Sequence, residues 1–89
     1  MVNKRRSEME IISKILEISK EGAKKTEILY NGNLNYMQLK SYLNYLISNE
    51  ILEVKEIKNN GNRFKLYKPT EKGLIFHQDI NKVLSYLTC

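Results

Sequence analysis

Residues 35–49 hold most of the side chains in this chain that could recognise another molecule. Asn35 is a typical helix N-cap, and Gln38 stands three residues later, where it would complete a capping box. Amide side chains of such a helix can pair with the edge of adenine in a DNA major groove. The stretch is therefore interpreted as a DNA recognition helix, the alternative being an ordinary solvated helix face. Its predicted contact residues are Asn35, Tyr36, Met37, Gln38, Lys40, Ser41 and Asn44.

The opposite side of the same helix is apolar. Leu39, Leu43 and Leu46 recur at steps of four and three residues, which places them on one side of a helix and predicts that they are buried. A chain of 89 residues makes one domain near the lower size limit for a self-sufficient core. The leucines are therefore predicted to hold the helix while it displays its amides and hydroxyls.

Positive charge accompanies this helix in three clusters. The chain carries 15 Lys and Arg against 10 Asp and Glu, a net charge of +5, which permits binding to a polyanion. The clusters lie before residue 7, at residues 24–25, and in the acid-free segment 58–69. Solvated lysines are the alternative for any one cluster. The residues predicted to contact phosphate or a groove are Lys24, Lys25, Thr26, Asn60, Asn62, Arg63 and Lys65.

Two further helices are predicted before the recognition helix. Apolar residues recur at helical spacing after Ser7, a suitable N-cap, and Gly22 is expected to end this helix in a left-handed conformation. Thr26 is expected to cap a second helix that runs through Asn31. The segment 31–33, Asn-Gly-Asn, predicts a sharp turn because Gly and Asn tolerate positive φ. A short helix, a tight turn and a longer helix make a helix-turn-helix.

A β-hairpin and a last helix are predicted to follow. Residues 51–57 lose the helical period and are predicted to form a strand, and 63–68 alternate as its partner. Between them, residues 59–62 contain the Asn-Gly pair typical of a type I′ turn. Pairing is expected to end at Pro69, which has no N–H to donate. Thr70 is expected to cap a helix that continues to about residue 87.

The last helix carries an apolar seam rather than a wide apolar face. A chain this small offers such a seam few partners, so two copies of the helix are expected to pack antiparallel in a two-fold homodimer. The alternative is that the helix folds back on the first helix within a monomer. The predicted interface residues are Phe76, Ile80, Val83, Leu84 and Leu87.

This order of elements, mainly α with a β-hairpin, is that of a winged helix-turn-helix domain over residues 1–89. Residues 1–6 are expected to form a basic flexible arm, 7–69 the winged-helix core and 70–89 the dimerisation helix. The recognition helix of such a domain enters the major groove, and the hairpin, here 58–65, reaches the backbone or the minor groove.

Several segments also match a pattern seen in a known family. They are Lys25-Thr26-Glu27-Ile28, residues 30–36, the set Leu39, Tyr42, Leu43 and Leu46, and Thr70-Glu71-Lys72-Gly73. In these segments the chain resembles the small archaeal winged-helix proteins, which include single-domain transcriptional regulators and ten-kilodalton chromatin proteins. The resemblance implies dimerisation through the last helix. Family members usually carry Gly where this chain has Asn49 or Glu50, and Asn49 is expected to supply the left-handed turn.

Other chemistry is not indicated by the residues. His77 is the only histidine and is expected at the surface or an interface, and Cys89 is alone. The chain has no zinc-type Cys and His set and no Gly-rich phosphate loop, so we expect no enzymatic activity, metal, cofactor or small-molecule substrate. No apolar run is long enough to span a bilayer, and the protein is expected in the cytoplasm, at the nucleoid.

The resulting hypothesis is a homodimeric, sequence-reading protein that binds double-stranded DNA and regulates transcription. Two alternatives remain open. One is a nonspecific architectural protein of chromatin. The other is a protein-interaction module that docks a partner through Tyr36, Met37, Tyr42 and Tyr45, since aromatic residues suit either kind of partner.

Overall fold

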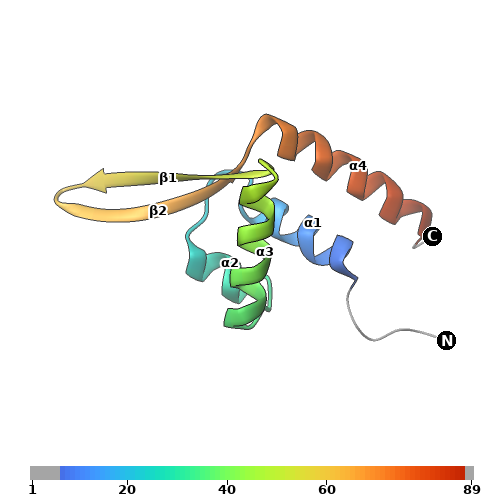
Figure 1. The fold of residues 1–89 in the computed structure, drawn as a ribbon, viewed down its shortest axis with the longest axis horizontal. Helices are drawn as coiled ribbons and strands as arrows, with labels where there is room; N and C mark the ends of the chain where they lie inside the picture. Colours follow the sequence, from blue (N-terminus) through green and yellow to red (C-terminus); the bar gives the residue numbers. More distant parts are fainter. Residues whose placement is uncertain (1–6, 88–89) are drawn as a thin grey trace.

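The computed structural model describes residues 7–87, which fold into four helices and one antiparallel hairpin in the predicted order (Figure 1). The predicted basic arm, 1–6, and Cys89 lie outside the described residues. The winged-helix expectation for the fold is thus confirmed. The elements are α1 (Glu8–Ile18), α2 (Lys25–Asn31), α3 (Tyr36–Ser48), β1 (Leu52–Asn59), β2 (Asn62–Pro69) and α4 (Glu71–Leu87).

Local capping starts three of the helices where the sequence places them. The Ser7 hydroxyl accepts from the backbone N–H of Glu10 at 3.1 Å at the start of α1. Asn35 accepts from the N–H of Gln38 at 2.8 Å at the start of α3. The Thr70 hydroxyl accepts from the N–H of Gly73 at 2.9 Å. Each cap satisfies a donor that has no partner within the helix.

The predicted cap of α2 is wrong by two residues. Lys24 is the N-cap, its backbone N–H donates to Glu27 Oε1 at 2.8 Å, and Thr26 lies in the first turn. The reason lies outside the helix: Ala23 forms a β-bridge with Tyr67 of β2, with N–H to O distances of 2.9 and 2.8 Å. Because the bridge holds residue 23 extended, the helix begins directly after it.

The turns around α3 agree with the expectation only in part. Asn33 has φ 54°, but Gly32 has φ −84° and is needed for another reason, since a Cβ there would lie 2.6 Å from Ile28 O. After α3 the left-handed residue is Glu50, with φ 61°, and not Asn49. The Asn49 side chain instead donates to Tyr45 O at 2.8 Å, which keeps its backbone near the helix.

The hairpin forms as predicted and is slightly longer. Asn60 and Gly61 have φ 54° and 82°, the two positive values of a type I′ turn. The register runs from the pair Asn59 and Asn62 at the tip to the pair Leu52 and Pro69 at the base. Figure 1 shows the hairpin projecting from the helical body, so that its tip lies well away from α3.

The core lies where α1, α2, α3 and the base of the hairpin meet. Its fully buried side chains include Ile15, Leu16, Ile28, Leu39, Leu46 and Leu52. The predicted leucine side of α3 is buried throughout. No helix within residues 7–87 is both long and apolar enough to cross a lipid bilayer.

Helix α4 lies along α1. Some residues of the predicted dimer seam are therefore buried within the single chain, and others stay exposed. Ile80 is only 3% exposed and belongs to the core of the single chain, while Phe76 and Leu84 are partly buried against that core. The assignment of Ile80 to a dimer interface is therefore corrected. Val83 and Leu87 remain 42% and 70% exposed. The fold-back onto α1, which the sequence left as the alternative, uses one side of α4 and leaves another side uncovered.

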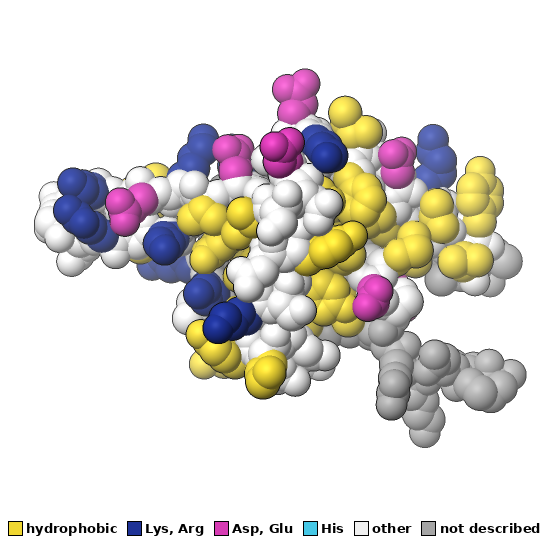
Figure 2. Space-filling view, in the orientation of Figure 1, with side chains coloured by type: hydrophobic (Ala, Val, Ile, Leu, Met, Phe, Trp, Pro, Cys, Tyr) yellow, Lys and Arg dark blue, Asp and Glu magenta, His cyan; other side chains and the backbone are white. Residues whose placement is uncertain are grey.

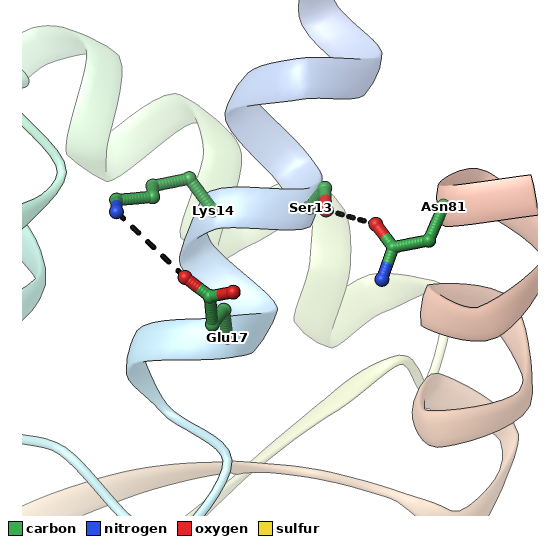
Figure 3. A network of polar contacts seen from close by, with 4 residues as sticks. All are labelled: Ser13, Lys14, Glu17 and Asn81. Carbon is green, nitrogen blue, oxygen red and sulfur yellow. Dashed lines mark hydrogen bonds and ion pairs between the residues drawn. The ribbon is translucent and has the colours of Figure 1, made fainter. Parts of the chain in front are cut away.

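A side-chain hydrogen bond links α1 to α4. Ser13 Oγ on α1 donates to Asn81 Oδ1 on α4 at 2.7 Å (Figure 3). The neighbouring Lys14–Glu17 pair, at 3.7 Å, lies within α1 and is exposed, so it adds little stability. Apolar contact, with the Ser13–Asn81 hydrogen bond for orientation, holds α4 against α1.

Candidate nucleic-acid interface

The outward side of α3 is polar, uncharged over most of its length and well exposed. Tyr36, Met37 and Tyr45 are 60%, 78% and 54% exposed, and Lys40, Ser41 and Asn44 are exposed beside them. Figure 2 shows this face as a pale band, with Lys and Arg side chains gathered toward the hairpin. The other flank is mainly apolar, with acidic side chains beside the apolar patch. Positive charge is therefore concentrated on one side of α3.

The structure brings the start of α2 and the hairpin into one basic cluster. Lys24, Lys25 and Thr26 line the same shallow hollow, about 300 Å³, as Phe64 and Lys65 of β2. The Lys24 ammonium lies 4.7 Å from the centroid of the Phe64 ring, a cation–π contact worth roughly 0.5–1 kcal/mol at exposed sites. Lys25 and Lys65 are exposed beside this contact. Residues forty positions apart thus form one cationic surface.

The hairpin tip is a second cationic surface. Lys58 lies directly opposite Arg63 in the register, and Asn59 opposite Asn62. Two like charges at facing positions destabilise a hairpin, and a bound anion would relieve this repulsion. Lys58 was missing from the predicted contact residues, although the type I′ turn at residues 60 and 61 fixes its pairing with Arg63. Asn60, Asn62 and Arg63 are exposed at the tip, as expected.

Two of the predicted base-reading side chains are already occupied. Asn35 Oδ1 accepts from the N–H of Gln38, and Gln38 Oε1 accepts from the N–H of Asn35 at 3.1 Å. Their acceptor atoms are therefore committed to the cap. A change in DNA binding on replacing Asn35 would therefore not by itself show a base contact, because the replacement also removes the helix cap.

Replacement of Asn35 separates these two roles. Asn35→Ala is expected to lower the free energy of unfolding by about 1 kcal/mol through loss of the cap. Asn35→Ser keeps a capping oxygen and is expected to stay within a few tenths of a kcal/mol of the wild type. Urea denaturation followed by circular dichroism measures both changes. Equal stability of the alanine and serine variants would contradict the capping role.

A larger hollow lies on the other flank of α3, between it and α1. It encloses about 500 Å³ and is lined by Glu8 and Ile12 of α1 and by Met37, Gln38, Ser41, Tyr42 and Tyr45 of α3. The Glu8 carboxylate at this hollow disfavours a phosphate there. The hollow is the surface that the protein-docking alternative would use.

His77 is a packing residue of the α1–α4 contact. Its Nε2 atom is buried without a hydrogen bond. Burial lowers the pKa of His77 below its ordinary value, Glu17 acts in the opposite direction, and Lys20 lowers the pKa further. Among residues 7–87, no group of three or more His, Cys, Asp or Glu side chains could hold a metal ion.

A short helix, a tight turn and a longer helix, with a hairpin beside them, are the parts of a winged helix-turn-helix domain. Residues 5–87 match a family described as winged helix-turn-helix. The chain belongs to the winged helix-turn-helix family. As a winged helix-turn-helix protein it has α2 and α3 as the helix-turn-helix and β1 and β2 as the wing.

Relatives of this winged helix-turn-helix chain occur in archaea. It is 41% identical over 70 residues to an uncharacterized protein of Methanocaldococcus jannaschii, a match that covers 78% of this chain. The chain spans 64% of the length of that relative. Together with the winged helix-turn-helix match of residues 5–87, this archaeal relative confirms the resemblance to small archaeal winged-helix proteins.

Solved structures share the fold. Sso10a-2, a DNA-binding protein from Sulfolobus solfataricus, superposes with a TM-score of 0.78 at 28% identity, covering 91% of this chain and 81% of that chain. A PadR-like transcriptional regulator from Bacillus cereus also superposes with a TM-score of 0.78, at 19% identity, covering 88% of this chain and 84% of that one. The second likeness shows the fold alone.

Proposed function

We propose that this winged helix-turn-helix protein binds double-stranded DNA as a homodimer and regulates transcription. The observation that carries the proposal is the acid-free outer face of α3. Helix α2 and the hairpin, which together form the Lys24, Lys25 and Lys65 cluster, lie on one side of it. The similarity to Sso10a-2, a DNA-binding protein, supports it. The proposal makes the chain a binding protein rather than an enzyme, acting at the chromosome in the cytoplasm.

The proposed contacts fall into two classes. Lys25, Thr26 and Lys65 would contact phosphates beside the major groove, and the wing tip with Lys58 and Arg63 would contact the backbone or minor groove farther along the duplex. These contacts set position without reading sequence. The outward side chains of α3 would face base edges, because a major groove admits one α-helix.

The proposed dimer uses the uncovered side of α4. Val83 and Leu87 are the members of the predicted seam that stay exposed, and Tyr86 beside them is 76% exposed. Pairing of this side with its mate would add apolar burial to a small core. It would also place two recognition helices on one duplex.

A nonspecific architectural role in chromatin is the second candidate. It is favoured by the several cationic side chains on α2 and the wing, because such side chains bind the phosphates of a duplex of any sequence. The two candidates differ in whether α3 discriminates among sequences, whereas a pure protein-docking module would bind no duplex.

Salt dependence tests DNA binding directly. Duplex affinity is expected to fall steeply as ionic strength rises, because each neutralised phosphate releases a counterion. Lys25→Ala and Arg63→Ala are each expected to weaken binding to every sequence and to reduce the salt slope by about one unit per lost contact. Fluorescence anisotropy of labelled duplexes at several salt concentrations measures both quantities.

Lys72→Ala is the matched control, since it removes one charge from the exposed first turn of α4, outside the proposed interface. It is expected to leave the slope nearly unchanged. Binding that hardly depends on salt, or equal losses from Lys72→Ala and Lys25→Ala, would refute the proposed surface.

A further inference from the structure

The chemistry of the exposed α3 face is selective among base pairs. Arginine and the carboxylates that accept from cytosine are absent from Tyr36–Ser48, which leaves Lys40 as the one side chain of this helix that could pair with guanine. Adenine pairs with amide side chains, and thymine presents a methyl group to apolar side chains. The face therefore offers groups for A·T pairs, with Lys40 as its only cation.

The amide available for this purpose is Asn44. Asn35 and Gln38 form the capping box, whereas the Asn44 side chain makes no hydrogen bond to any residue of 7–87 and is exposed. It can offer a donor and an acceptor together, which is the pattern that adenine N7 and N6 require. Capping thus leaves Asn44 as the one unengaged amide on this face among the described residues.

The apolar group available is Met37. Its side chain is 78% exposed, and it lies two turns before Asn44 on the same side of α3. Tyr36, Met37, Lys40, Ser41 and Asn44 surround a shallow hollow of about 360 Å³. An apolar side chain beside a free amide in such a hollow matches the thymine methyl and adenine edge of one groove. Ser41 lies between them, and its hydroxyl can form a hydrogen bond with either base.

We propose that α3 reads A·T base pairs in the major groove, with the Met37 side chain against a thymine methyl and the Asn44 amide on adenine N6 and N7. This inference rests on the proposed function, that α3 enters the major groove of double-stranded DNA. In this arrangement Lys40 contacts phosphate, whereas a Lys40 contact with guanine O6 and N7 would favour G·C and contradict the inference.

Base analogues test the inference without changing the overall duplex. The probes are alternating A·T and alternating G·C duplexes of about two helical turns, long enough for a dimer. Two further A·T duplexes carry deoxyuridine for thymine, which removes only the methyl, or 7-deaza-adenine, which removes only N7. Binding is measured by anisotropy at one salt concentration.

The wild type is expected to prefer A·T over G·C by about tenfold or more. It is expected to lose about three- to tenfold, or about 0.7–1.4 kcal/mol, with each analogue, because each analogue removes only part of a base contact. Met37→Ala is expected to be insensitive to deoxyuridine, while Met37→Leu keeps the sensitivity. Asn44→Ala is expected to be insensitive to 7-deaza-adenine. Lys40→Met is expected to weaken all duplexes alike, and a loss confined to the G·C duplex would contradict the assignment of Lys40 to phosphate.

The results distinguish a failure of A·T reading by α3 from a failure of DNA binding itself. Salt-dependent binding with equal affinity for A·T and G·C would overturn the inference and leave DNA binding intact. Preference for A·T that survives both analogues would also overturn it, because the preference would then come from duplex shape. Absence of binding to any duplex would overturn the proposed function itself. The exposure of Met37 and Asn44 makes these variants neutral for folding, which circular dichroism verifies.

Discussion

Replacing Gly73 with alanine is expected to lower the free energy of unfolding by about 3 kcal/mol, the upper range of overpacking in a buried site. Gly73 is buried in the first turn of α4, where the helix passes the chain entering β1. A Cβ on Gly73 would lie 2.0 Å from Ile51 O and 3.0 Å from Ile51 C. These are backbone atoms, so α4 would have to move.

The sign of this effect opposes helix propensity. Alanine is a better helix former than glycine by about 1 kcal/mol, so an isolated helix would gain from the same change. Urea denaturation at a fixed protein concentration measures the difference, with Lys72→Ala as a neighbouring exposed control that should change stability by about 0.5 kcal/mol or less. Unchanged or raised stability of Gly73→Ala would contradict the close approach of α4 to Ile51.

Truncation of the buried side of α4 is expected to have a similarly large effect. Ile80→Ala should cost about 2–5 kcal/mol, as for other large-to-small changes in a packed core. Ile80 is buried at 3% exposure among side chains of the core that it shares with α1. The change would leave a cavity that the α1–α4 contact cannot close without moving the helix.

Val83→Ala combined with Leu87→Ala is the matched experiment on the exposed side of α4. This double variant should retain the folded monomer and weaken self-association, which sedimentation equilibrium measures over a range of protein concentrations. The fixed concentration in the unfolding experiment matters because the stability of a dimer depends on it. Unimpaired association of the double variant would refute the proposed dimer surface, and a neutral Ile80→Ala would refute the packing of α4 on α1.

The wing tip and the Lys24, Lys25 and Lys65 cluster are held in place by different interactions. The wing tip depends on the type I′ turn and on register, which are properties of one hairpin. The cluster of Lys24, Lys25 and Lys65 depends on the Ala23–Tyr67 bridge, which ties the loop before α2 to β2. Loss of that bridge would separate the cluster while leaving the tip intact.

Sequence alone determined the features that depend on residues a few positions apart. The caps at Ser7, Asn35 and Thr70, the Asn60-Gly61 turn and the leucine side of α3 were all predictable. Each arises from a hydrogen bond, a backbone preference or a helical period within a single element. The order of such elements was sufficient to predict the winged-helix fold.

Tertiary structure decided the features that depend on which elements meet. The bridge to Tyr67 sets the start of α2 at Lys24, and the contact with α1 buries Ile80 while leaving Val83 exposed. The approach of α4 to Ile51 requires Gly73 to lack a side chain. A periodic pattern shows that a helix has an apolar side, but it does not specify the partner, because burial against another helix or another subunit selects the same residue types.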